Sequence, residues 1–214
     1  NEISKINTQQ KTETIFKLNE NLEANNYYSS QSNIKPNVVA GLEQWQHIHQ
    51  VLDSRDTGPW TNDPVNGRHQ GYLCCGATSA MEIIASYNIL QPDPIYTHGH
   101  TSQYGKYLSD VYTYNDVTYN NFTISPNGRP GFTSGAHGYM WNSGGSPNSN
   151  AQSFLEKHGI DATHSSNITW SKIKAELDME FPYMLCTTSL TDGHIVVAIG
   201  QYSDGTSLYC NDPY

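Results

Sequence analysis

Three hydrophobic runs near the C-terminal end give the clearest pattern in the chain. Residues 181–189, 194–202 and 206–212 are rich in β-branched, aromatic and aliphatic side chains, which favour strands. A Ser-Asp-Gly sequence at residues 203–205 separates the last two runs and has the composition of a tight turn. The pattern predicts an antiparallel sheet in which the last two runs are neighbouring strands.

A buried helix is predicted to begin at Cys75 and to end before Pro92. The apolar residues after Cys75 recur at i, i+1, i+4 and i+7, which is the spacing of one helical face. They are Ala80, Met81, Ile84 and Tyr87. Helices that precede an antiparallel sheet are typical of an α+β fold.

Two later helices are marked by their ends. Residues 150–159 form a helical pattern that Gly159 terminates, since glycine adopts the left-handed conformation at a helix C-terminus. Residues 170–179 form another, with Thr169 as its predicted N-cap.

The first 40 residues differ from the rest because they are largely polar. A weak apolar stripe predicts a helix over residues 8–25, and a Ser-rich linker precedes Pro36. We predict a polar N-terminal extension over residues 1–40, either a pro-segment or an appendage, and one domain over residues 41–214. Within that domain, residues 42–52 have helical spacing and predict a short amphipathic segment.

Charge and hydropathy exclude two classes of partner. The chain has 11 Lys and Arg against 20 Asp and Glu, a net charge of −9, and no basic stripe, so nucleic-acid binding is not expected. No run of 18 apolar residues is present, so no membrane span is expected. The low charged fraction and a first residue other than Met fit a secreted or cell-surface protein whose signal has been removed.

Neither the cysteines nor the histidines have metal-site spacing. The four cysteines lack a C-x-x-C pair, and the nine histidines include two i, i+2 pairs but no H-E-x-x-H sequence. We therefore expect no metal and no other cofactor. Cys186 and Cys210 lie on strands that a third strand should separate, so we expect no disulfide between them.

A nucleophile and a base can be assigned from position. Cys75 lies where a loop enters a helix, and the backbone N–H groups and helix dipole there stabilise a thiolate. His194 begins one strand and Asp212 ends its antiparallel neighbour, which should place the two together. Taken singly, Cys75 also fits a core thiol and His194 a polar strand end.

Three motifs in this order resemble those of C39-like peptidases, in the papain-like cysteine peptidase superfamily. Residues 75–81, CGATSAM, are similar to the C-G-P-T-S-x-A-M motif that opens the family's central helix, with Ala77 in place of Pro. Residues 193–200, GHIVVAIG, resemble its G-H-hydrophobic-G strand, and residues 211–214, NDPY, its N-D-P-x ending.

The resemblance implies a papain-like α+β fold over residues 41–214, in which the helix that carries Cys75 packs on the C-terminal sheet. It implies Cys75 as nucleophile, His194 as general base and then acid, and Asp212 as the residue that orients the imidazole. It also implies an oxyanion hole built from a Gln side chain and the Cys75 N–H. Gln70 is the predicted Gln, although the papain-like pattern has it six residues before the Cys rather than five, and Gln50 is a more distant alternative.

The implied function is a cysteine peptidase that cleaves peptide bonds through a thioester acyl-enzyme. The alternatives are a peptidoglycan amidase or endopeptidase with the same chemistry, and a catalytically silent papain-like binding module. The expected partner is a peptide or protein substrate, with cell-wall peptide as one possibility. The sequence does not predict an oligomeric state.

Overall fold

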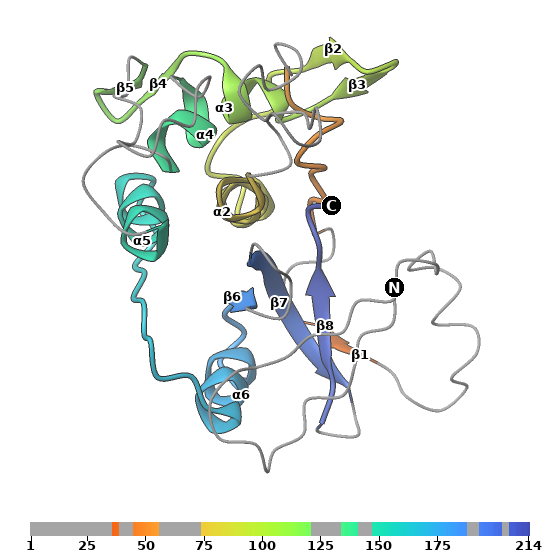
Figure 1. Ribbon diagram of the computed structural model, residues 1–214, viewed down its shortest axis with the longest axis vertical. Coiled ribbons are helices and arrows are strands. Elements are labelled where there is room, and N and C mark those ends of the chain that lie inside the picture. The colour runs from red at the N-terminus through yellow and green to blue at the C-terminus, as the bar shows by residue number, and fades with distance from the viewer. Residues whose placement is uncertain are drawn as a thin grey trace. The chain divides into compact units, whose positions relative to one another are not determined.

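The computed structural model describes seven stretches of the chain (Figure 1), namely residues 36–38, 45–55, 74–120, 134–140, 147–187, 193–202 and 206–214. These fall into two compact units. One comprises Asn1–Glu43 and Ser165–Asp212, and the other comprises Gln44–His164 and Pro213–Tyr214. The helix predicted over residues 8–25 and the predicted turn at 203–205 lie outside the described residues.

An antiparallel sheet centred on one long strand forms the first unit. Its strands are β1 (Pro36–Val38), β6 (Tyr183–Thr187), β7 (His194–Tyr202) and β8 (Leu208–Asn211). β6 pairs with the first half of β7 and β1 with its last residues, while β8 pairs along the opposite edge. The three C-terminal strands predicted from the hydrophobic runs are therefore confirmed.

The core of this unit lies along β7, which is covered on both faces. The four residues at its centre are at most 2% exposed, and they are Val196, Val197, Ala198 and Ile199. Helix α6 (Trp170–Asp178) packs on β6 and β7 and buries Ile173 and Leu177. The Thr169 hydroxyl accepts a hydrogen bond from the Lys172 N–H at 3.4 Å, as the predicted N-cap requires.

Helix α2 (Cys75–Ser86) is the centre of the second unit. It contacts α3 (Gly105–Ser109), α4 (Gly135–Met140) and α5 (Pro147–Lys157), which lie above it and to its left in Figure 1. Every residue from Gly76 to Ser86 is buried, rather than one face alone. The predicted start at Cys75 is confirmed, but the helix ends before Tyr87, which is 40% exposed and not part of the apolar face.

Two short hairpins occupy a region with no clear sequence pattern. They are formed by β2 (Ile95–Thr97) with β3 (His100–Ser102), and by β4 (Tyr112–Tyr114) with β5 (Val117–Tyr119). Each two-residue turn has positive φ at both positions, at His98–Gly99 and at Asn115–Asp116. This is the turn conformation whose twist matches that of paired strands.

The amphipathic segment predicted over residues 42–52 is not helical where the structure describes it. Residues 45–49 have no regular structure and residues 50–53 form a turn. Side chains of His49 and Asp53 bind backbone N–H groups of the turn, and such bonds compete with helical ones. Ile48 and Val51 are nevertheless buried, so the apolar pattern identified residues that enter the core.

Part of the predicted N-terminal extension belongs to the sheet. Pro36–Val38 pair with Gly200–Tyr202 of β7, so the segment before residue 41 contributes a strand. The boundary near residue 40 and the role of residues 1–35 stay predictions, since residues 1–35 and 39–44 lie outside the described part of the chain.

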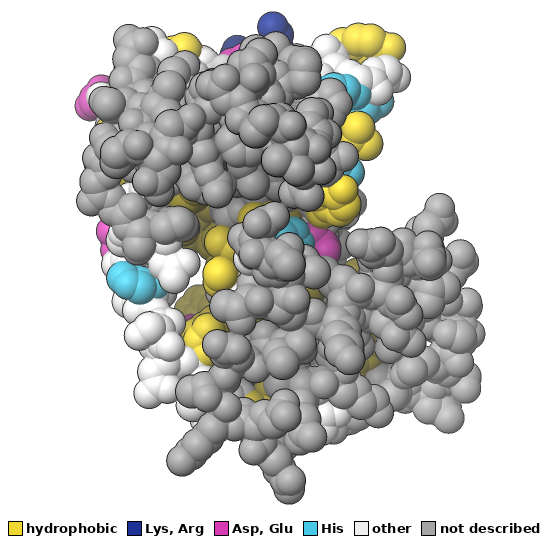
Figure 2. All heavy atoms as spheres, viewed as in Figure 1, with side chains coloured by type: hydrophobic (Ala, Val, Ile, Leu, Met, Phe, Trp, Pro, Cys, Tyr) yellow, Lys and Arg dark blue, Asp and Glu magenta, His cyan; other side chains and the backbone are white. Residues whose placement is uncertain are grey.

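Mixed helices and small antiparallel sheets make the molecule compatible with the predicted α+β class. In the described part of the chain, no helix is both long and apolar enough to cross a membrane. Lys and Arg side chains are sparse among the described residues on the face drawn in Figure 2, in keeping with the total of 11.

Candidate functional site

Cys75 is the first residue of α2 and is only partly buried, unlike the residues that follow it. The preceding residue, Cys74, is 1% exposed, and its carbonyl oxygen accepts hydrogen bonds from the Thr78 N–H and hydroxyl, each at 2.9 Å. This doubled contact fixes the first turn of the helix. Of the two adjacent cysteines, Cys75 is therefore the one whose side chain reaches solvent.

His194 and Asp212 form a hydrogen-bonded pair at one end of the sheet in the first unit. Nε2 of His194 lies 2.8 Å from Oδ1 of Asp212, and both side chains are largely buried. A carboxylate can only accept here, so Nε2 carries the hydrogen and Nδ1 is the nitrogen that can take up a proton. This contact agrees with the adjacency expected of two neighbouring strands.

A bulge in β7 decides the face on which Asp212 lies. Gly200 pairs with Tyr209, and the next pair along the ladder joins Ala198 to Cys210. β8 therefore advances by one residue where β7 advances by two, and the extra residue of β7 is Ile199. A ladder without the bulge would set Asp212 opposite Val197, on the sheet face away from His194. With the bulge, the next position opposite Asp212 is Val196, which shares the His194 face.

None of the four cysteines, all of which lie in the described part of the chain, forms a disulfide bond. Cys186 is exposed on β6 opposite Ile195, and Cys210 lies on β8 opposite Ala198, so β7 separates them in the strand order from which no bond between them is expected. Enclosure in the sheet, and secondarily the Asp212 charge, raise the pKa of the Cys210 thiol well above its ordinary value. Cys210 is therefore a poor nucleophile at neutral pH.

The remaining predicted residues are placed as follows. Gln70 lies outside the described residues, and its role stays a prediction. Gln50 is 1% exposed, and its backbone N–H donates to the Pro213 carbonyl at 2.6 Å. Cys75 belongs to the second unit and the His194–Asp212 pair to the first, so their approach also stays a prediction.

One histidine of each i, i+2 pair forms hydrogen bonds within the protein. His100 Nε2 lies 2.7 Å from Asp53 Oδ1, and His49 Nδ1 accepts from the N–H groups of Val51 and Leu52 at 3.1 Å. Among the residues described, no three or more His, Cys, Asp or Glu side chains are grouped so as to hold a metal ion.

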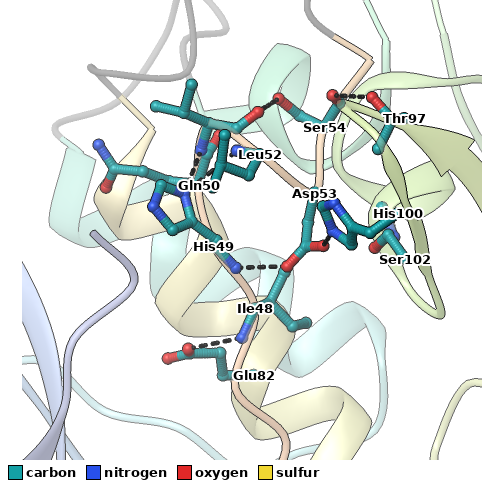
Figure 3. Close-up of polar contacts among 12 residues, drawn as sticks. Ile48, His49, Gln50, Leu52, Asp53, Ser54, Glu82, Thr97, His100 and Ser102 are labelled. Carbon is teal, nitrogen blue, oxygen red and sulfur yellow. Dashed lines mark hydrogen bonds and ion pairs between the residues drawn. The ribbon is translucent and has the colours of Figure 1, made fainter. Parts of the chain in front are cut away.

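Sequence reasoning missed one ionisable residue in this region. Glu82 is fully buried in α2, and its Oε1 accepts a hydrogen bond from the Ile48 N–H at 3.0 Å (Figure 3). A carboxylate within a helix that is otherwise apolar is the signal that could have identified it, because acidic side chains are rarely buried without a partner.

The comparisons with known proteins agree with the motifs. A family model described as the Peptidase_C39 like family matches residues 59–214, which is most of the chain. No curated protein and no solved structure matches. The match includes Cys75, His194 and Asp212, together with Gln70.

Proposed function

Since the chain belongs to the Peptidase_C39 like family, we propose that it is a cysteine peptidase with Cys75 as nucleophile, His194 as general base and acid, and Asp212 as the residue that orients the imidazole. The family itself indicates a peptidase-type hydrolase acting on a peptide. The observation that carries the finer assignment is the 2.8 Å hydrogen bond between His194 Nε2 and Asp212 Oδ1.

The proposed reaction uses the two nitrogens of His194 differently. Asp212 holds Nε2–H, so Nδ1 exchanges a proton with the Cys75 thiol. The thiolate attacks the carbonyl carbon of the peptide bond, and the imidazolium then gives its Nδ1 proton to the departing amine. The product of this half-reaction is a thioester between Cys75 and the acyl part of the substrate.

Hydrolysis of the thioester completes the cycle. Nδ1 of His194 takes a proton from water as the water oxygen attacks the thioester carbonyl, and the carboxylic acid leaves as the Cys75 thiolate forms again. In both steps the oxyanion is stabilised by the Cys75 N–H and by the side chain of Gln70. One such donor is typically worth about 2.7–4 kcal/mol of transition-state stabilisation.

The test combines turnover with active-site labelling. The full chain is incubated with a peptide library and, separately, with cell-wall stem peptides, and then with an epoxide thiol reagent followed by peptide mass spectrometry. We expect hydrolysis of at least one substrate class and an adduct on Cys75, with both lost in Cys75→Ala.

Cys186→Ser is the matched control, because Cys186 is an exposed thiol that pairs with Ile195, on the sheet face opposite to His194, and has no proposed role. It should retain both hydrolysis and the Cys75 adduct. An adduct on Cys186 and none on Cys75 in the wild-type chain would contradict the proposal. So would hydrolysis by the Cys75→Ala variant.

A further inference from the structure

We propose that Glu82 is a positioning residue for this site, because it anchors a turn that in turn holds the residue following Asp212. This role presupposes the proposed function, in which Asp212 orients His194. The observations that support it are linked contacts around residues 48–54, several of which Figure 3 draws.

Glu82 connects this turn to the helix that begins at Cys75. It lies seven residues after Cys75, which is two helical turns along nearly the same face of α2. Its Oε1 accepts from the Ile48 N–H at 3.0 Å, and both residues are buried. A buried backbone N–H requires an acceptor, so Glu82 fixes the chain at Ile48.

The turn after Ile48 is stiffened by its own side chains. Asp53 Oδ2 accepts from the His49 N–H at 2.6 Å, and the Asp53 N–H donates to the His49 carbonyl at 3.0 Å. Two contacts attach the turn to the first hairpin, from His100 Nε2 to Asp53 Oδ1 at 2.7 Å and from the Thr97 hydroxyl to the Ser54 carbonyl at 3.0 Å. A displacement at Ile48 is therefore passed along the turn rather than absorbed within it.

The turn binds the chain immediately after Asp212. The Gln50 N–H donates to the Pro213 carbonyl at 2.6 Å, and the rings of His49 and Tyr214 are 6.1 Å apart. Pro213 is joined to Asp212 by one peptide bond, and the proline ring restricts its φ to about −65°. The turn therefore holds the backbone directly after Asp212, the residue that binds His194.

Two substitutions separate the reach of the Glu82 side chain from its carboxyl group. Glu82→Gln keeps the length and an acceptor oxygen but replaces the carboxyl group by an amide, whereas Glu82→Asp keeps the carboxyl group and shortens the side chain by one methylene. If Glu82 acts by holding Ile48, Gln should replace it and Asp should not.

The experiment measures kcat and KM on the full chain, together with the low-field proton resonance of the His194 Nε2–H by NMR. We expect Glu82→Gln to keep kcat within about threefold and to keep the resonance. We expect Glu82→Asp to lower kcat roughly 10- to 100-fold, because a misplacement of about 1 Å has effects of this order. Its KM should change less than about twofold, and its resonance should broaden or move upfield.

Met81→Ala is the control for loss of stability alone, because Met81 is a fully buried neighbour in the same helix. It should lower the melting temperature but leave kcat and the resonance unchanged where the protein is folded. Asp53→Ala, which removes the acceptor of the His49 N–H, should act like Glu82→Asp and serves if that variant does not fold.

Wild-type kcat and resonance in Glu82→Asp and Asp53→Ala would overturn the inference. Equal losses in Glu82→Gln and Glu82→Asp would show that the reach of the side chain does not account for the effect, and would also overturn it. If the wild-type chain shows no Cys75-dependent turnover, the proposed peptidase activity fails, and the His194 resonance in the same variants still decides whether Glu82 positions Asp212.

Discussion

Acidification should destabilise the folded chain through one buried imidazole, His137 of α4. It is 1% exposed, and burial lowers its pKa from 6.5 to about 3. In the unfolded chain the imidazole takes up its proton near pH 6.5, whereas in the folded chain it stays neutral until about pH 3. The stability that depends on neutral His137 is therefore complete above pH 6.5 and falls as the pH drops towards 3.

The size of this effect follows from the two pKa values. Each unit of difference corresponds to about 1.36 kcal/mol, so complete acidification removes roughly 4–5 kcal/mol of the free energy of unfolding. This is a large part of the 5–15 kcal/mol or so that stabilises a typical domain. His158 adds to it, because burial is also the main cause that lowers its pKa, partly offset by the hydrogen bond to the Phe154 carbonyl.

Urea denaturation followed by tryptophan fluorescence, at intervals from pH 7.5 to pH 4, measures the dependence. His137→Gln removes the titrating group and should flatten the decline by up to about 1.36 kcal/mol per pH unit between pH 6 and pH 4. His164→Gln makes the same substitution at an exposed histidine and serves as the matched control.

An identical pH dependence in wild type and His137→Gln would refute the assignment of the effect to this residue. The result also bears on the proposed peptidase, because the acid limb of a rate profile then contains unfolding as well as imidazole protonation. Comparison of rate profiles between wild type and His137→Gln separates the two.

Three substitutions and one pair of insertions test the site and its supports. Asp212→Asn should lower kcat roughly 100-fold or more while Cys75 is still labelled, since the imidazole loses the acceptor that fixes its tautomer; full activity would show that another group orients it. Cys74→Ser should keep most hydrolysis and labelling, and an inactive variant would contradict the choice of Cys75. One Ala inserted directly before Asp212 should move the carboxylate to the other sheet face and abolish turnover, whereas one inserted directly after Tyr209, opposite the bulge, should be tolerated; equal rates would refute the register argument. Thr169→Ala should cost about 1 kcal/mol in urea denaturation with kcat unchanged, and an unchanged midpoint would show that the N-cap contributes little.

Elements with a long or sharply bounded pattern could be predicted from the sequence. The three C-terminal strands, the start of α2 at Cys75 and the N-cap at Thr169 all agree with the structure. The two hairpins between α2 and α4 could not, because strands of three residues are too short to display a period. Their turns do carry residue types that favour positive φ, Gly99 in one and Asn115 with Asp116 in the other, so turn composition was the signal that the sequence offered.

The sequence predicted which residues of the candidate site lie close together, but not the structural features that hold them there. Adjacent strands explain why His194 and Asp212 lie near each other, but the Ile199 bulge that sets their common face has no marker in the sequence. The segment around the turn at residues 50–53 was predicted to be amphipathic because its buried residues, Ile48 and Val51, have helical spacing. The contacts of Glu82 depend on tertiary structure, which periodicity does not report.

The position of β1 has a consequence for the order in which the chain folds. β1 pairs Pro36 with Tyr202, which lies 166 positions later in the chain, whereas the end of β7 and the start of β8 are a few residues apart. Closing the longer loop costs more conformational entropy before any contact compensates for it. We therefore expect the β7–β8 hairpin, which brings His194 and Asp212 together, to form early, and β1 to join the sheet after the transition state, so that contacts of β1 slow unfolding more than they speed folding.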